Sequence, residues 1–161
     1  MAYRETDPFR ALDALRRGIS VTRESGNRFN ESHLAHTVSG LEAKHGDPLA
    51  ALDYVTLAIR NYHDAGSFAF IHPALANLAA ILDRLGRYEP AATIASFAAL
   101  SPIATAAFPE INTVIAHLRD ELSSEAYQSL ARKGESMTTS AMATYAYEQI
   151  DHARAELNAV S

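Results

Sequence analysis

The sequence predicts an all-α protein in which about three helical hairpins stack into a superhelix and one further helix caps the C-terminal end. Three observations carry this prediction. A segment repeats after 40 residues, apolar residues recur at helical spacing within each copy, and alanine, the strongest helix former, is abundant. No segment reads convincingly as a β-strand, so the hairpins are expected to be helical throughout.

The repeat begins with Asp-Pro in both of its clear copies. "DPFRALDAL" starts at Asp7 and "DPLAALDYV" starts at Asp47, and seven positions between residues 7 and 26 are identical to those 40 residues later. An aspartate can cap the exposed N–H groups of a helix, and proline fits the first helical position. A third copy, "EPAATIASF", starts at Glu89 after two extra residues. One hairpin cannot bury its apolar face alone, so repeated hairpins are expected to stack.

Glycines mark where these helices are expected to stop, because glycine tolerates the left-handed turn after a helix. The first helices of units one and two are predicted from Asp-Pro to Gly26 and to Gly66. The second helices are predicted over roughly 31–44 and 73–85, closed by Gly46 and Gly86. The predicted units of this single domain, 1–161, are about 7–46, 47–88 and 89–134.

The third unit departs from the pattern. Prolines within "LSPIATAAFPE" oppose helix continuation, and a helix is predicted to resume near Glu110. A short helical segment over 125–132 is expected to end at Gly134. The capping helix is predicted over about 138–158, with Thr138 or Thr139 as its N-cap.

Composition narrows the function classes. The formal net charge is −5, no cysteine is present, and no apolar run reaches the length of a membrane span. We therefore expect a cytoplasmic protein without disulfides or thiolate metal sites, which contacts neither nucleic acid directly nor a membrane. The N-terminus does not have the pattern of a signal peptide.

The candidate binding residues lie in "NYHDAGSFAFIHP", around the turn of the second unit. This segment concentrates aromatic and imidazole side chains, and the residues singled out are Tyr62, His63, Phe68, Phe70 and His72. Packing between helices is the ordinary interpretation of such residues. The functional interpretation is one edge of a binding groove, because helical solenoids bind on such faces. Tyr145 and Tyr147 raise the same two alternatives.

Motifs for chemistry are weak. His33 and His36 are three residues apart, and "EAKH" ends at His45 with the Glu-x-x-His spacing of di-iron bundles, but neither set has enough further ligands. The acid and histidine in "EQIDH", 148–152, have the spacing of a simple helix-surface pair. No serine has the Gly-x-Ser-x-Gly context of a hydrolase nucleophile. We therefore predict no catalytic residue, no metal ligand and no cofactor.

Four segments carry a resemblance to a known family. They are "GDPLAALDYVTLAIRNYHDAG", "LDRLGRYEPAATIASFA", "AFPEINTVIAHLRDEL" and "LARKGESMTTSAMATYAYEQIDHAR". Together they resemble the C-terminal, tetratricopeptide-like helical-repeat region of actinobacterial, especially mycobacterial, STAND-type signalling ATPases and of LuxR-type or cyclase-linked transcriptional regulators. The resemblance implies a regulatory arm that senses a ligand or a partner. The phosphate-loop pattern of the ATPase module is not in this sequence, so no ATPase residue carries over.

The predicted function is a non-enzymatic module for protein interaction and regulation. Its partner would be another protein or a second copy of the chain, since so short a stack can expose an end face for homodimer formation. The alternative is a small-molecule sensor that binds its ligand between helices, motivated by the aromatic turn at 62–72.

Overall fold

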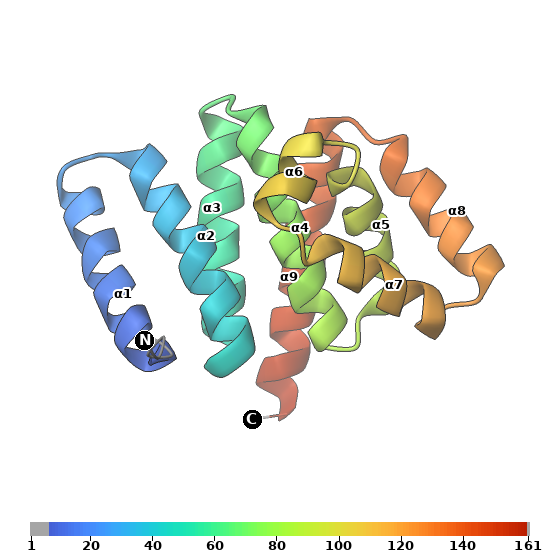
Figure 1. The fold of residues 1–161 in the computed structure, drawn as a ribbon, viewed down its shortest axis with the longest axis horizontal. Helices are drawn as coiled ribbons and strands as arrows, with labels where there is room; N and C mark the ends of the chain where they lie inside the picture. The colour runs from blue at the N-terminus through green and yellow to red at the C-terminus, as the bar shows by residue number, and fades with distance from the viewer. Residues whose placement is uncertain (1–6, 161) are drawn as a thin grey trace, which may run out of the picture.

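The computed structural model describes residues 7–160, which form nine helices and no strand (Figure 1). The all-α prediction is therefore confirmed. The helices are α1 (Pro8–Glu24), α2 (Arg28–His45), α3 (Pro48–Asp64), α4 (Phe68–Arg84), α5 (Tyr88–Ala98), α6 (Pro102–Ala107), α7 (Ile111–Glu121), α8 (Ser124–Glu135) and α9 (Thr139–Val160).

The predicted start signals form caps. Asp7 Oδ1 accepts a hydrogen bond from the Phe9 N–H at 3.0 Å, and Asp47 Oδ1 accepts one from the Leu49 N–H at 2.9 Å. The stop signals are glycines with positive φ after α1, α3 and α4, namely Gly26, Gly66 and Gly86, at 71°, 68° and 75°. The Asp-Pro and glycine repeat therefore sets the ends of the helices in both of its clear copies.

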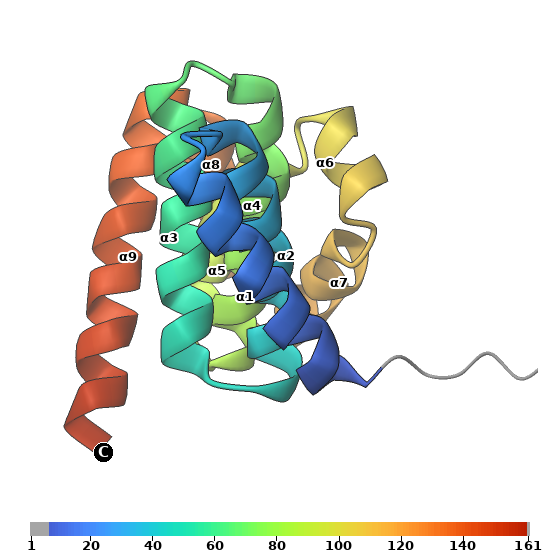
Figure 2. The same ribbon diagram turned by 90° about the vertical axis from the view of Figure 1, so that its left-hand side faces the viewer.

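Helices α1 to α5 form a row in which each helix packs against the next, and α8 packs beside α5 (Figure 1). Two further layers cover this row. Helices α6 and α7 lie on one face, against α4 and α5, while α9 lies on the opposite face along α3 (Figure 2). No helix within 7–160 is both long and apolar enough to cross a membrane.

The core sits where these layers overlap. Every residue of α4 from Pro73 to Leu82 is buried, and so is every residue of α5 from Ala91 to Ala98. Alanine makes up much of both segments, and its small side chain lets helices approach closely on every side. The outer helix α1 has only Leu12 and Ile19 buried, because it packs against α2 alone within this row.

The predicted start of one helix needs correction. Helix α4 begins at Phe68 rather than at Pro73, which lies inside it; the burial of Ile71 extends the apolar stripe backwards past the proline. Helix α8 ends at Glu135, one residue after Gly134, where the sequence predicted its end, and Gly134 is itself helical. A Cβ at Gly134 would come within 2.0 Å of the Thr93 carbonyl oxygen, so glycine is required there for the close crossing of α5 and α8.

The predicted capping helix forms as α9, and Thr138 caps it: the Thr138 hydroxyl oxygen accepts from the Ala141 N–H at 3.1 Å. It does not stand at the end of the row, where α8 lies. Helix α9 instead crosses the row and contacts α3, α5 and α4. Arg154 of α9 binds the carboxylate of Asp53 on α3 at 2.6 Å, which fixes the two helices side by side.

Candidate functional site

The five residues predicted to form a groove edge do not share one surface. Tyr62 is buried, and Phe70 stacks on it with ring centroids 5.8 Å apart. His63 points toward α9, where its Nε2 lies 3.5 Å from the Ser140 hydroxyl, and its ring is 6.3 Å from Phe68. His72 stacks on Phe97 at 4.9 Å. Tyr62 and Phe70 therefore belong to one cluster, whereas His63 with Phe68, and His72, have other surroundings.

That cluster brings together four rings from three helices. Phe29 and His33 of α2 lie 4.4 Å apart, and both contact Phe70 of α4, at 5.3 and 5.2 Å between centroids. Tyr62 of α3 completes it through a hydrogen bond between its hydroxyl and His33 Nδ1 at 2.9 Å. Edge-to-face and stacked rings at these distances stabilise one another beyond simple burial.

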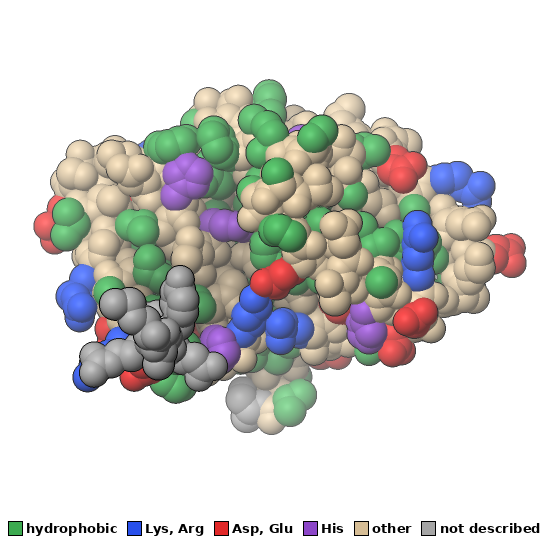
Figure 3. Space-filling view, in the orientation of Figure 1, with side chains coloured by type: hydrophobic (Ala, Val, Ile, Leu, Met, Phe, Trp, Pro, Cys, Tyr) green, Lys and Arg blue, Asp and Glu red, His purple; other side chains and the backbone are tan. Residues whose placement is uncertain are grey.

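Beside the cluster lies a cavity of about 180 Å³. We call it the aromatic cavity. Helices α2, α3, α4 and α6 line it, and the lining residues are His33, His36, Tyr62, Phe70, Pro73, Ile103 and Ala107. Figure 3 shows histidine and hydrophobic side chains gathered around a hollow where α2, α4 and α6 meet. Its walls carry no carboxylate, lysine or arginine.

The histidines of the cavity are held neutral. Burial lowers the pKa of His36 to about 4, with a smaller contribution from neighbouring His33, and burial also lowers the pKa of His33. Burial raises the pKa of Tyr62 to about 12, so its hydroxyl keeps its proton. The cavity therefore presents no charge near pH 7.

His36 has an unusual hydrogen-bonding state. Its ring nitrogen Nδ1 is buried and has no partner among the residues that the structure describes. Its backbone is firmly held, because the His36 carbonyl accepts from the Ser39 hydroxyl at 2.7 Å and from the side-chain amide of buried Asn77 at 3.2 Å. A fixed backbone with an unsatisfied buried side-chain atom requires an explanation, since most such atoms are paired.

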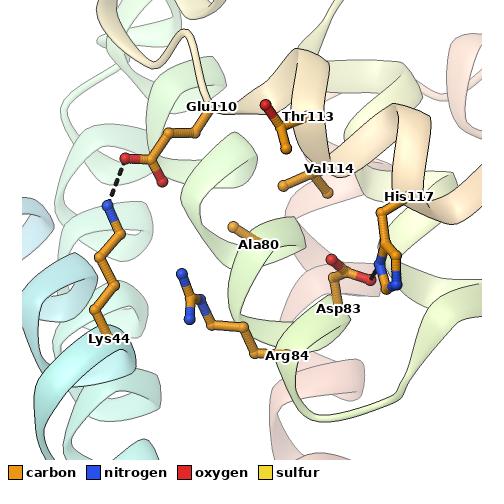
Figure 4. Close-up of a pocket in the computed structure, with 8 residues that line it drawn as sticks. All are labelled: Lys44, Ala80, Asp83, Arg84, Glu110, Thr113, Val114 and His117. Atoms are coloured by element: carbon orange, nitrogen blue, oxygen red, sulfur yellow. Dashed lines mark hydrogen bonds and ion pairs between the residues drawn. The ribbon is translucent and has the colours of Figure 1, made fainter.

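A larger and more polar hollow, of about 510 Å³, opens on the same face between α2, α4 and α7 (Figures 3 and 4). We call it the charged hollow. Its lining residues are Lys44, Ala80, Asp83, Arg84, Glu110, Thr113, Val114 and His117. Lys44 pairs with Glu110 across its rim, and Arg84 extends into the space between that pair and Asp83 (Figure 4).

His117 has the opposite environment to His36. Its Nδ1 lies 2.7 Å from the Asp83 carboxylate and its Nε2 lies 3.3 Å from that of Glu121. The hydrogen bond and charge of Asp83 raise the pKa of His117, with a smaller contribution from Glu121. The carboxylates of Asp83 and Glu110 offset the charges of Lys44 and Arg84 in the lining, so the hollow has no strong net charge with which to attract an ion.

The other residues that the sequence analysis singled out make contacts that hold helices together. Glu42 of "EAKH" is buried, binds the Arg16 guanidinium and accepts from the Asp47 N–H at 3.0 Å, which joins α1 to the turn between α2 and α3. Tyr145 and Tyr147 lie under Lys133 and Arg60, at 4.7 and 5.6 Å. These contacts agree with the ordinary interpretation of the two tyrosines, which is packing between helices.

No group of three or more His, Asp or Glu side chains within 7–160 is arranged to hold a metal ion. His33 and His36 share the cavity wall, but the Nδ1 atom of His33 is already bonded to Tyr62. The residues that sequence reasoning missed are Phe29, Ile103 and Ala107. The only available signal was the His33–His36 spacing, which places both imidazoles on one helix face.

Comparisons of the chain with protein-family models, curated proteins and solved structures find no match.

Proposed function

We propose that the chain is a non-enzymatic, tetratricopeptide-like module that binds a protein partner through the face around the aromatic cavity. The observation that carries this proposal is the rim of that cavity. Phe29, Phe70 and Ile103 keep 47%, 37% and 47% of their surface exposed. Phe29 contacts Phe70, and Phe70 and Ile103 line the same cavity, so the three side chains form one apolar patch. Exposed apolar patches of this kind mark interaction sites on soluble proteins.

The form of the patch supports a protein partner. Three helices of a packed stack hold the rim residues, so little conformational entropy is lost when a partner orders them. Aromatic anchors beside a recess are the usual energetic centre of a protein interface. The sequence resemblance to the repeat region of STAND-type signalling ATPases and linked transcriptional regulators supports a regulatory role for the same surface.

The test compares two pairs of exposed apolar residues. Phe29→Gln with Ile103→Gln removes the rim, whereas Phe9→Gln with Val21→Gln removes two apolar side chains of α1 that are even more exposed. Purified wild type and both variants, matched by circular dichroism and melting temperature, serve as bait in lysate of the source cells. We expect one prey protein to be lost by the rim variant and retained by the α1 variant.

Equal capture by all three baits would contradict the proposed surface. Light scattering across a concentration series identifies the special case of self-association: a dimer that only the rim variant disrupts makes the second copy the partner. A dimer that only the α1 variant disrupts would place the interface at the end of the row and overturn the proposal.

A second candidate function is the sensing of a small molecule between helices. The specific observation in its favour is the aromatic cavity itself, which lies between α2, α4 and α6 and is lined by the imidazole of His36.

A further inference from the structure

We propose that the aromatic cavity binds a small, uncharged aromatic molecule that carries a hydrogen-bond-accepting oxygen, such as an aryl ketone or ester, and that His36 donates to this oxygen. The ligand would occupy the aromatic cavity itself, not the exposed rim. The proposal stands whether or not a protein binds around the cavity.

The size of the cavity sets the size of the ligand. Its volume is about 180 Å³, and an apolar cavity of ~150 Å³ is known to hold benzene. A single ring with a two- or three-atom substituent therefore fits. A larger molecule would have to extend over Phe70 and Ile103 toward solvent.

The walls select for an uncharged, mostly apolar ligand. Phe70, Pro73, Ile103 and Ala107 contribute apolar surface. The Tyr62 hydroxyl is already bonded to His33, so it adds little free polarity. A charged group brought here would lose its hydration without meeting an opposite charge, which is strongly unfavourable.

His36 supplies the polar contact. A neutral imidazole has one N–H and one lone pair, on different ring nitrogens. Its Nδ1 is buried without a partner, and a buried N–H without an acceptor is rarer in proteins than an acceptor without a donor. The tautomer with the proton on Nε2 is therefore favoured. No residue within 7–160 hydrogen-bonds to Nε2, and unlike Nδ1 it is not a buried atom without a partner, so its N–H is accessible to a ligand oxygen in the cavity that His36 lines.

The donor is also preorganised. Asn77 and Ser39 hold the backbone carbonyl of His36, and the Phe108 ring lies 6.4 Å from its imidazole. Asn77 of α4 is 2% exposed and its hydrogen bond to α2 fixes the position of the helix that carries His36. A site whose polar group is already in place loses less freedom on binding.

The experiment uses two probes of nearly identical shape. Acetophenone has a carbonyl oxygen where α-methylstyrene has a methylene carbon. Each is titrated into the ¹⁵N-labelled full chain, and dissociation constants are read from amide shifts in α2, α4 and α6. Both ligands have about nine heavy atoms, and for molecules of this size a Kd of about 1 mM is expected.

Three variants locate the site and the hydrogen bond. Ile103→Trp fills the cavity and should abolish the binding of both probes, whereas Leu100→Trp, at an exposed position in the same segment, should leave both unchanged. His36→Phe keeps a ring but removes the donor. It should raise the dissociation constant of acetophenone about fivefold relative to that of α-methylstyrene, as expected for one lost hydrogen bond.

Two results would overturn the proposal. One is the absence of saturable shifts in α2, α4 and α6 with either probe; the other is binding that survives Ile103→Trp. If His36→Phe fails to fold, long-range ¹H–¹⁵N correlation spectra of the wild-type imidazole replace it. Those spectra should show His36 protonated on Nε2, with Nε2 shifting on addition of acetophenone. A proton on Nδ1 would refute the assigned donor.

Discussion

The aromatic cavity and the charged hollow border the same helix, α4, but they treat the same residue type in opposite ways. In the cavity, burial among aromatic and apolar groups lowers the pKa of His36 to about 4. In the hollow, Asp83 raises the pKa of an exposed imidazole, that of His117. Desolvation decides the first case and a neighbouring carboxylate the second. The protonation state of a histidine near pH 7 is therefore set by its surroundings in the fold and cannot be read from the sequence alone.

The largest difference between the two regions is expected in stability. Tyr62→Ala removes a ring that is 3% exposed and should lower the free energy of unfolding by about 3–5 kcal/mol. Glu110→Ala removes a half-exposed partner of Lys44 and should lower it by less than about 1 kcal/mol. Urea denaturation with a common m-value measures both. Similar losses for the two variants would contradict the distinction between a packed cavity and a solvated hollow.

The second effect is the pH dependence contributed by His36. Its folded-state pKa is depressed from 6.5 to about 4, so the unfolded chain binds the extra proton first as pH falls. Stability is therefore full above pH 6.5 and declines toward pH 4, by about 3 kcal/mol from this group. His33, which faces it with a pKa also lowered by burial, adds in the same direction.

Denaturation of wild type and His36→Phe at several pH values between 7 and 4 isolates that contribution, because the carboxylates are common to both proteins. The difference in unfolding free energy between them should change with pH over this window. Parallel pH profiles for the two proteins would show that the imidazole is not desolvated.

A smaller effect is expected for the ion pair across the rim of the charged hollow. A double-mutant cycle with Lys44→Ala and Glu110→Ala should give a coupling free energy below about 1 kcal/mol, because both side chains remain partly exposed. The coupling should fall further in 0.5 M salt, where the charges are screened. A coupling that salt leaves unchanged would indicate a buried pair instead.

The smallest expected effect on stability comes from Asp83→Asn, because its partner His117 is exposed. The substitution should nevertheless change the titration of the His117 ring directly. Losing the carboxylate should bring the pKa of His117 down toward its ordinary value. The favourable interaction in the wild type is present below pH 6.5 and is lost as pH rises through the raised pKa. NMR titration of the His117 ring in both proteins is the measurement, and identical midpoints would exclude Asp83 as the cause.

The sequence predicted the features that depend on local interactions. Asp-Pro starts and glycine stops act within one turn of the chain, so the ends of α1 and α3 followed from the repeat. The five residues of the predicted binding segment lie on several surfaces for an equally local reason. Adjacent residues of a helix point about 100° apart, so Tyr62 and His63 had to face different neighbours.

The cavity itself depends on contacts between distant segments. Ile103 and Ala107 reach His36 only because α6 folds back over α4, and no periodicity in the sequence encodes that return. Likewise, the sequence predicted the helix over about 138–158 but not which helices it contacts. Periodicity identifies the face of a helix that is buried, whereas the partner of that face is a property of the whole fold.

The position of α9 has a consequence for how the protein unfolds. In an open row of hairpins each unit touches only its neighbours, and the ends can melt independently. Helix α9 instead ties Arg154 to Asp53, 101 residues earlier in the chain, across the middle of the row. Such distant contacts raise the contact order, which slows folding, and couple the central hairpins to the C-terminal part. We expect α3, α5 and α9 to exchange their amide protons in one cooperative opening, while α1 exchanges first.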